Sequence, residues 1–458
     1  MHLPRTSYIL ICGLGRSGLS MARFLAAKGF QIKATDIDAA RKVHEPELHH
    51  LGIDTQIGYH DPETFVRAGA VVVSPGIPLT MPYLMQAKAA GVPLLGDLDI
   101  FTLYNKTPVV AITGTNGKTT VTTLVRDMLE ASGISTFMGG NIGTPLVDCL
   151  MNGSSAQVVV AEISSFQLDL ARHFKPEIAV LLNISPDHLD RYEDMAAYCR
   201  SKWSIFKNQT SAHTAIVNAD MTDDCQIQPP PASRTLKFSC DPDTRIHQGA
   251  RIIHQTIFLN LPELSDGHST QIDCRNLVRI PGIHNLENIA AAGLAALCAG
   301  GNVTGLLQAV GAFEGLPHRL TFVAKIDGVQ FYNDSKATNT DAVIRALTCF
   351  TKPVVLILGG REKDTDFTLL QPSLKAVKQI IAMGEAADHI HDLFARNFRV
   401  KRVPDMKTAV TEAHAAAQPG DIVLLSPACA SFDMFENYAD RGDAFTCHVQ
   451  ELEMKRHG

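Results

Sequence analysis

The chain has 458 residues, of which 45% are hydrophobic and 19% charged, which is enough apolar material for several packed cores and excludes global disorder. Its formal net charge of −6 and lack of a basic stripe argue against nucleic acid and anionic membranes as partners. The first apolar run, residues 8–12, is too short for a signal-peptide core or a transmembrane helix. Its 10 cysteines include no Cys-x-x-Cys pair and are typical of reduced thiols, so we expect a cytoplasmic protein.

Short apolar runs alternate with helix-like stretches along the chain, a pattern typical of parallel α/β domains. We predict a Rossmann-like domain at residues 1–97, a central P-loop-type mononucleotide-binding domain at 98–316 and a C-terminal Rossmann-like domain at 317–458. Short β-like runs between about residues 212 and 280, such as 215–217 and 252–259, predict a small antiparallel patch in the central domain. Apolar strands are expected at residues 8–12, 31–35, 71–73, 108–112, 157–161, 178–182, 353–358, 379–383 and 421–425.

The most specific motif opens the central domain, where an apolar strand leads into glycines and then into a helix. Gly114 and Gly117 allow backbone N–H groups to approach phosphate oxygens, Lys118 can neutralise phosphate charge, and the Thr119 hydroxyl can bind magnesium. The motif is not a complete Walker A sequence, because Ile112 stands where the first glycine is expected. We interpret it as a nucleotide phosphate loop rather than an ordinary turn, and its residues are Gly114, Thr115, Asn116, Gly117, Lys118, Thr119 and Thr120.

A second glycine pattern follows the first apolar strand. Gly13, Gly15 and Gly18, with Asp36 at the end of the next strand, fit a dinucleotide fingerprint. The same architecture can hold a uridine nucleotide without nicotinamide. This pattern alone therefore leaves a nicotinamide-dependent oxidoreductase open.

Three further residues lie near the ends of apolar strands or on a nearby helix. Glu162 follows a buried strand, and an isolated buried carboxylate needs a cation or hydrogen-bond donors, which magnesium held with Thr119 would supply. His188 lies in a polar loop and is equally consistent with a structural hydrogen-bonder and a ligand. Lys202 lies on a helix-like stretch where lysine is usually solvated. The third domain has polar loops at residues 316–319, 333–339, 359–364 and 426–432, each of which could be an ordinary solvated loop. The first two are plausible partners for phosphates and an acidic substrate.

Taken together, these motifs resemble the Mur ligases over essentially the whole chain. The order of motifs is similar to that of the branch that adds D-glutamate to UDP-N-acetylmuramoyl-L-alanine. The motifs that carry the resemblance lie at residues 13–18, 74–76, 113–120, 139–143, 162–168, 187–192, 333–339 and 426–431.

The resemblance implies an ATP-dependent amide ligase of cytoplasmic peptidoglycan precursor synthesis that works through an acyl phosphate. It implies two magnesium ions. We also expect a monomer, and the charge and composition predict no nucleic-acid or membrane partner. The UDP-linked substrate is expected at Arg16, Ser17, Asp36, Gly76, Asn141 and Ser164. ATP is expected at the phosphate loop and at Asn285, Asn288, Arg319 and Asp334. The amino acid is expected at Lys336, Thr338, Lys363, Ser431 and Phe432.

The resemblance also implies the metal and catalytic residues. One magnesium ion is expected at Thr119 and Glu162, and the other at His188 and a carbamylated Lys202. The carbamate makes physical sense, because a cationic lysine would repel magnesium whereas a carbamate is an anionic ligand. The expected catalytic residues are Lys118, Glu162, His188 and Lys202.

The chain departs from the commoner pattern of this branch at several positions. Threonines stand at Thr115 and Thr119 where serines are common, and Asp38 occupies a place where an arginine can occur. Phe432 and Tyr438 replace a smaller aliphatic residue and a phenylalanine near the amino-acid pocket. The alternatives are therefore a ligase of the same type for L-glutamate or another amino acid, a nicotinamide-dependent oxidoreductase, and a P-loop kinase or non-catalytic nucleotide-binding module.

Overall fold

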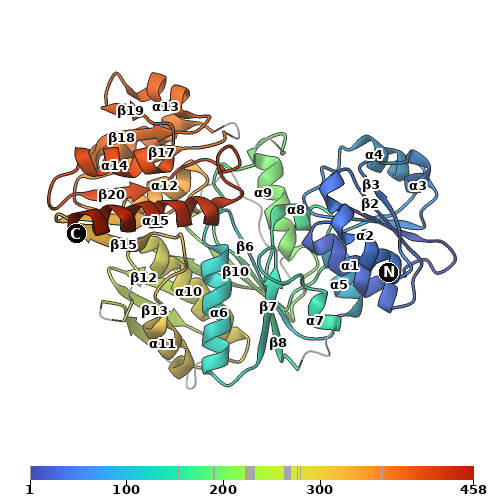
Figure 1. Cartoon of the computed structure of the whole chain (residues 1–458). Helices are drawn as coiled ribbons and strands as arrows, with labels where there is room; N and C mark the ends of the chain where they lie inside the picture. The colour runs from blue at the N-terminus through green and yellow to red at the C-terminus, as the bar shows by residue number, and fades with distance from the viewer. Residues whose placement is uncertain are drawn as a thin grey trace. The chain divides into compact units, whose positions relative to one another are not determined.

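A computed structural model describes residues 2–151, 155–188, 191–221, 233–261, 270–275, 277–278, 280–362 and 365–457 (Figure 1). The chain divides into two compact units. The first compact unit comprises Met1–Asn183, Ala196–Asp273 and Asn288–Val310, and the second comprises Ile184–Met195, Cys274–Glu287 and Gly311–Gly458. The α/β class is confirmed, with two sheets in the first compact unit and one in the second. The domain boundaries at residues 97/98 and 316/317 stay predictions.

The first sheet has five parallel strands in the order β3-β2-β1-β4-β5. Every residue of β1 and β4 is buried, as a parallel strand covered on both faces requires. The strands are β1 (Ile9–Cys12), β2 (Ile32–Asp36), β3 (Asp54–Ile57), β4 (Ala70–Val73) and β5 (Leu94–Leu95). The helices are α1 (Arg16–Ala27), the 3-10 helix η1 (Ala39–His44), α2 (Glu45–His50), α3 (Pro62–Val66), α4 (Pro82–Ala89) and α5 (Asp97–Tyr104).

The second sheet has nine strands in the order β14-β13-β12-β11-β10-β9-β6-β8-β7. Its strands are β6 (Val109–Thr113), β7 (Thr136–Gly140), β8 (Val158–Glu162), β9 (Ile178–Leu181), β10 (Thr214–Asn218), β11 (Arg234–Ser239), β12 (Gly249–Ile253), β13 (Thr256–Asn260) and β14 (Thr270–Asp273). The helices that follow β6 in the chain are α6 (Lys118–Ala131), α7 (Asp148–Met151), α8 (Ser165–Leu168), α9 (Met195–Trp203), η2 (Ser204–Phe206), α10 (Ile283–Cys298) and α11 (Val303–Ala312).

The predicted antiparallel patch is confirmed for β12, β13 and β14 but is wrong for the run at Ala215. That run belongs to β10, which pairs in parallel with β9 and β11. Four of the five residues of β10 are buried, because the strand continues the interior of the parallel sheet, whereas β13 alternates between more and less buried residues.

The third sheet, in the second compact unit, has six strands in the order β15-β16-β20-β17-β18-β19, and only β15 is antiparallel to its neighbour. Its strands are β15 (Thr321–Ile326), β16 (Val329–Asn333), β17 (Val354–Gly359), β18 (Val377–Met383), β19 (Val400–Arg402) and β20 (Ile422–Leu425). Its helices are α12 (Thr340–Leu347), η5 (Phe367–Ala376), α13 (Ala387–Phe394), α14 (Met406–Ala416) and α15 (Tyr438–His457).

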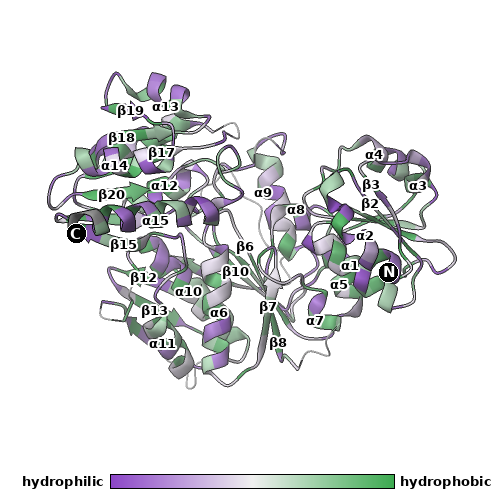
Figure 2. Ribbon diagram, in the orientation of Figure 1, coloured by the Kyte–Doolittle hydropathy of each residue, from purple (hydrophilic) through white to green (hydrophobic). Residues whose placement is uncertain are grey.

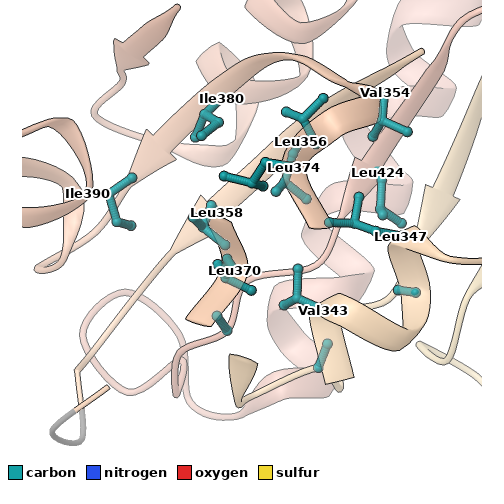
Figure 3. Close-up of a cluster of buried hydrophobic side chains, with 14 of the residues drawn as sticks. Val343, Leu347, Val354, Leu356, Leu358, Leu370, Leu374, Ile380, Ile390 and Leu424 are labelled. Atoms are coloured by element: carbon teal, nitrogen blue, oxygen red, sulfur yellow. The ribbon is translucent and has the colours of Figure 1, made fainter. Parts of the chain in front are cut away.

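Strand β17 shows how this third sheet builds a core on each face. Leu356 and Leu358 point to one face, where they join residues of α12, η5 and α13 (Figure 3). Val355 and Ile357 join residues of α14 and α15 in a second cluster. Alternate residues of a strand point to opposite faces, so the continuous apolar run of β17 supplies both cores. Figure 2 shows that hydrophobic residues predominate in the strands, whereas the helices contain both hydrophobic and hydrophilic residues.

Two expectations from the sequence concern the chain as a whole: the absence of a membrane-spanning helix and the state of the cysteines. No helix in the described part of the chain is both long and apolar enough to span a membrane. Eight of the described cysteines are free thiols, as expected for reduced cysteines.

Candidate nucleotide and substrate site

The predicted phosphate loop joins β6 to α6 at the carboxyl edge of the second sheet. Gly114 has φ +155° and Gly117, the N-cap of α6, has φ +86°. A Cβ atom at Gly117 would lie 2.4 Å from Oδ1 of Asn288. Glycine is therefore required at Gly117 both by the left-handed backbone and by the close approach of Asn288. The loop leads directly into the N-terminus of a 14-residue helix, an arrangement suited to binding phosphate.

Asn183, which follows β9, holds the phosphate loop in place. Its backbone oxygen accepts from the backbone N–H of Thr115 at 2.9 Å, and its Oδ1 accepts from the backbone N–H of Asn116 at 2.8 Å. Its Nδ2 donates to the carbonyl of Asn116 at 3.0 Å. These bonds fix the curvature of the loop. Asn183 was not singled out from the sequence, because its role depends on β9 lying next to β6.

Two lysines meet at one carbonyl of the loop. Lys118 donates to the backbone oxygen of Gly114 at 2.7 Å and to that of Thr115 at 2.8 Å. Lys202, on α9 and only 2% exposed, donates to the same Gly114 oxygen at 2.8 Å. The Lys202 ammonium also lies 4.7 Å from the ring centroid of Tyr198. The structure thus brings Lys202 to the phosphate loop, although its position on a helix did not indicate this.

Glu162 ends β8 beside the loop strand and is 1% exposed. Its Oε1 accepts from Nδ2 of Asn141 at 2.8 Å, while its Oε2 is buried without a hydrogen-bond partner. A buried carboxylate oxygen without a donor is costly, and a divalent cation would compensate it. Glu162 pairs with the strand that leads into the phosphate loop, and Thr119 stands in the first turn of the helix that follows the loop, so the two residues fit a magnesium ion.

A cavity of about 490 Å³ lies where the winding of the first sheet reverses between β1 and β4. Ligands of open α/β sheets bind at such switch points. Its lining residues are Gly13, Gly15, Arg16, Ser17, Asp36, Ile37, His60, Ser74, Pro75, Gly76, Ile77, Pro78, Met81, Asn141 and Gln167. Five predicted substrate residues are thus brought together, and Ser164 stands next to this set through its hydrogen bonds with Gln167.

The glycine turn of this cavity is tightly built. Gly13 has φ +94°, and its carbonyl accepts from the Ser74 hydroxyl at 2.8 Å. A Cβ atom at Gly18 would lie 1.8 Å from that carbonyl. The Asp36 carboxylate accepts from the backbone N–H of Leu14 at 2.6 Å, so it helps to hold the turn.

The histidine of the cavity was missed by sequence reasoning. Nδ1 of His60 lies 2.7 Å from the hydroxyl of Thr35, and burial lowers the pKa of His60 below its usual value. A neutral imidazole presents one donor and one acceptor. The only sequence signal is the position of His60, three residues after the end of the edge strand β3.

Asp334 follows β16 in the second compact unit and is 8% exposed. Its carboxylate accepts from the backbone N–H of Leu320 at 3.1 Å and from the hydroxyl of Ser426 at 2.8 Å. Burial raises the pKa of Asp334 to about 7, and the nearby Arg319 guanidinium opposes the rise. The structure therefore brings together the predicted loops at residues 333–339 and 426–432.

Arg441 of α15 ties these same loops together and was missed from the sequence. It is 1% exposed, and its guanidinium donates to the hydroxyl and carbonyl of Ser335 at 3.0 and 2.8 Å. It also donates to the carbonyls of Cys429 and Ala430 at 3.0 and 3.2 Å. Burial lowers the pKa of Arg441 to about 10.

The remaining predicted residues of the second compact unit differ in their burial and in their contacts. The Lys336 ammonium lies 3.7 Å from the ring centroid of Tyr438, and Ser431 is buried. Thr338 is half-buried, whereas Phe432 is 57% exposed. The Asn285 side chain donates to the carbonyl of Pro281 at 2.6 Å. Lys363 lies outside the described residues.

His188 also belongs to the second compact unit. It has φ +57°, and its Nε2 lies 3.8 Å from Oδ2 of Asp187, which accepts from Asn339 at 3.2 Å. Glu162 and Lys202 belong to the first compact unit. The grouping of His188 with them stays a prediction.

Comparisons with known proteins agree with this geometry. Three family models match the chain: the Mur ligase MurD-like N-terminal domain at residues 7–96, the Mur ligase middle domain at 112–296 and the Mur ligase glutamate ligase domain at 318–429. The chain is 42% identical to the UDP-N-acetylmuramoylalanine–D-glutamate ligase of Desulfosudis oleivorans, over 98% of this chain and 97% of that protein. The chain belongs to the Mur ligase family. It is also 40% identical to the ligase of the same name from Desulfatibacillum aliphaticivorans, over 96% of this chain and 97% of that protein.

Solved structures of Mur ligases share the fold of this Mur ligase. The UDP-N-acetylmuramate-alanine ligase MurC of Thermotoga maritima has a TM-score of 0.59 and 17% identity, covering 97% of this chain and 100% of that one. The MurF ligase of Thermotoga maritima in complex with ADP also has a TM-score of 0.59 and 17% identity, covering 93% of this chain and 96% of that one. The predicted family is therefore confirmed, whereas the roles of individual site residues stay predictions.

Proposed function

We propose that this Mur ligase uses ATP to join D-glutamate to UDP-N-acetylmuramoyl-L-alanine in peptidoglycan precursor synthesis. The observation that carries the proposal is identity of 37–42% with D-glutamate ligases over nearly the full chain. The phosphate loop, the buried carboxylate at Glu162 and the cavity of the first sheet support it. A further proposal is that the three domains meet at residues 97/98 and 316/317, that the enzyme is a monomer, and that it works in the cytoplasm, where ATP and nucleotide-linked sugars are supplied.

ATP and magnesium use follow from the family, and the residues of the first compact unit fit both. Residues 114–120 would hold the phosphates, with the N–H groups at the start of α6 facing them and the Asn288 side chain against Gly117. We assign Thr119 and Glu162 to one magnesium ion. Magnesium would offset negative charge on the transferred phosphoryl group.

The reaction couples two displacements. A carboxylate oxygen of the L-alanyl group attacks the γ-phosphorus of ATP, and ADP leaves to give an acyl phosphate. The amine of D-glutamate then attacks the acyl carbon, loses a proton, and expels phosphate as the amide forms. In the first displacement, Lys118 would turn from the carbonyls of Gly114 and Thr115 to the γ-phosphate, where its charge is most useful as negative charge develops.

We propose that Lys202 is carbamylated and serves, with His188, as a ligand of a second magnesium ion. The amine would take up carbon dioxide and release protons, leaving an N–H group and a carboxylate on the same side chain. The N–H group could keep the bond to the Gly114 carbonyl, which Lys202 makes at 2.8 Å. The new carboxylate would supply the anionic oxygen that magnesium prefers.

The amino-acid half of the proposal concerns the second compact unit. We assign Lys336, Thr338, Lys363, Ser431 and Phe432 to D-glutamate, and Arg319, Asp334 and Asn285 to the nucleotide. Support comes from the hydrogen bond between Asp334 and Ser426, which joins the loop containing Lys336 to the loop containing Ser431. Cationic and hydroxyl side chains of this kind suit a dicarboxylate.

The test of the proposed function is phosphate release with ATP, magnesium and UDP-N-acetylmuramoyl-L-alanine, scanned over D- and L-amino acids. We expect release with D-glutamate and formation of one amide per phosphate. Release only with another amino acid would overturn the assignment of the amino acid. An absorbance change of reduced nicotinamide without amide formation would instead support an oxidoreductase.

A second test addresses the carbamate. Lys202→Ala is expected to be inactive and to recover partial activity when small carboxylic acids are added, because they can replace the carbamate oxygens. Lys207→Ala, which removes an exposed lysine close by in the chain, is the matched control and should keep full activity. Full activity of Lys202→Ala without added acid would contradict the carbamate.

A further inference from the structure

The wall of the 490 Å³ cavity includes a buried carboxamide whose partner does not line the cavity. Gln167 is 3% exposed and lines the cavity, and its Nε2 donates to Oδ2 of Asp97 at 2.7 Å. Asp97 is the first residue of α5 and is 9% exposed. Its other oxygen, Oδ1, accepts from the backbone N–H of Leu98 at 2.9 Å. Both oxygens of Asp97 are therefore used as acceptors.

The oxygen of the Gln167 carboxamide is also held by hydrogen bonds. Its Oε1 accepts from the backbone N–H of Ser164 at 3.0 Å and from the Ser164 hydroxyl at 3.1 Å. The backbone N–H of Gln167 donates back to the Ser164 hydroxyl, which completes a capping box at the start of α8. A flipped carboxamide would place its NH₂ group against the Ser164 N–H and its oxygen against the Asp97 carboxylate. Only the observed orientation satisfies every partner.

Asp97 also has no role in the two displacements of the proposed reaction. Burial raises the pKa of Asp97 above its usual value, and the Gln167 and Leu98 donors oppose the rise. Burial makes the ionised form of this carboxyl group unfavourable, so its presence beside the cavity residue Gln167 indicates a functional role rather than packing alone.

We propose that Asp97 is a positioning residue, which orients the Gln167 carboxamide so that its second N–H group donates to the UDP-linked substrate in the cavity. Nε2 of Gln167 carries two hydrogens, and Asp97 accepts only one of them. A sugar, carbonyl or phosphate oxygen can accept the other. This inference rests on the proposed function, because it takes the UDP-linked substrate as the occupant of the cavity.

The main test is Asp97→Asn, measured by steady-state kinetics with each substrate varied in turn. The asparagine oxygen would be held by the Leu98 N–H, so its NH₂ group would face the NH₂ group of Gln167. Gln167 would then be displaced or flipped, and either change removes the donor from the substrate. We expect the KM for the UDP-linked substrate to rise roughly tenfold, while kcat and the KM for ATP and for D-glutamate change less than about twofold.

A reciprocal exchange separates positioning from stability. In Asp97→Asn/Gln167→Glu the asparagine NH₂ group can donate to one glutamate oxygen, and the other oxygen can still accept from Ser164. Thermal stability should return to that of the unaltered enzyme, whereas the KM for the UDP-linked substrate should stay raised, because the donor has been replaced by an acceptor. If Asp97→Asn alone does not fold, this double variant still tests the proposal.

Asp99 provides the matched control, because it lies on the same helix and is also fully buried. Its Oδ1 accepts from the backbone N–H groups of Arg172 and His173, both at 2.9 Å, and it does not line the cavity. Asp99→Asn keeps that acceptor, so all three KM values should stay unchanged.

Three results would overturn the inference: an unchanged KM in Asp97→Asn, an equal rise in all three KM values, or full recovery of KM in the double variant. Failure of the proposed function is distinguishable from all three. It would appear as no phosphate release by the unaltered enzyme with the UDP-linked substrate and D-glutamate.

Discussion

Replacing Arg441 by lysine should destabilise the second compact unit while leaving the first intact. The guanidinium makes four hydrogen bonds from three nitrogens to Ser335, Cys429 and Ala430. A lysine keeps the charge but offers one nitrogen, so we expect about two of the four bonds to be lost. With about 1–2 kcal/mol for each buried acceptor left without a donor, Arg441→Lys should lower the free energy of unfolding by about 2–4 kcal/mol.

The chain offers a way to assign this loss to one unit. Trp203, the single tryptophan, lies in the first compact unit and is 9% exposed. During urea unfolding, far-ultraviolet circular dichroism should show an early transition in Arg441→Lys, while the midpoint of tryptophan fluorescence stays unchanged. Arg402→Lys is the control, because Arg402 pairs with Asp388 at the surface and should change stability by less than about 0.5 kcal/mol. A loss of less than about 0.5 kcal/mol in Arg441→Lys would refute the reasoning.

Three further predictions concern residues of the first compact unit and of the second. Gly117→Ala should raise the KM for ATP about tenfold or more, because the left-handed backbone costs an alanine about 1–2 kcal/mol and the new Cβ atom displaces Asn288. The control is Gly133→Ala, which also has a left-handed backbone (φ +82°) but has open space around the new Cβ atom, and it should leave that KM unchanged. Glu162→Gln should lower kcat at least about a hundredfold across a magnesium titration of phosphate release, and near-normal turnover would exclude Glu162 as a ligand. Folding raises the pKa of Asp334, so the contribution of its protonated form to stability is present below about pH 4 and is lost as the pH rises through about 7. This contribution is worth up to about 4 kcal/mol, and urea titrations at several pH values should show that Asp334→Asn removes it. An unchanged pH dependence in Asp334→Asn would contradict the raised pKa.

The parts of the site that the sequence predicted are those with a local signature. The phosphate loop could be located because glycines at Gly114 and Gly117, a lysine and a hydroxyl follow one another directly after an apolar strand. The cavity of the first sheet could be located from Gly13 and Asp36 for the same reason. In both cases the chain itself carries the ligand-binding backbone, so neighbouring residues in sequence are neighbours in space.

The parts that escaped prediction depend on contacts between distant segments. Arg441 is 106 residues from Ser335, and nothing around it in the sequence distinguishes a buried arginine from a surface one. Gln167 and Asp97 are separated by 70 residues, and their pairing requires α5 and α8 to be adjacent. The parallel pairing of β10 was misjudged because a run of three apolar residues is compatible with either strand direction.

The cavity of the first sheet has a consequence for inhibitor discovery. All of its lining residues belong to the first compact unit, and its volume of about 490 Å³ is within the range of small-molecule pockets. A compound that fills it would need no residue of the second compact unit. On the proposed assignment of the cavity to the UDP-linked substrate, screening could begin with UDP displacement, an equilibrium assay that requires neither turnover nor the amino-acid substrate.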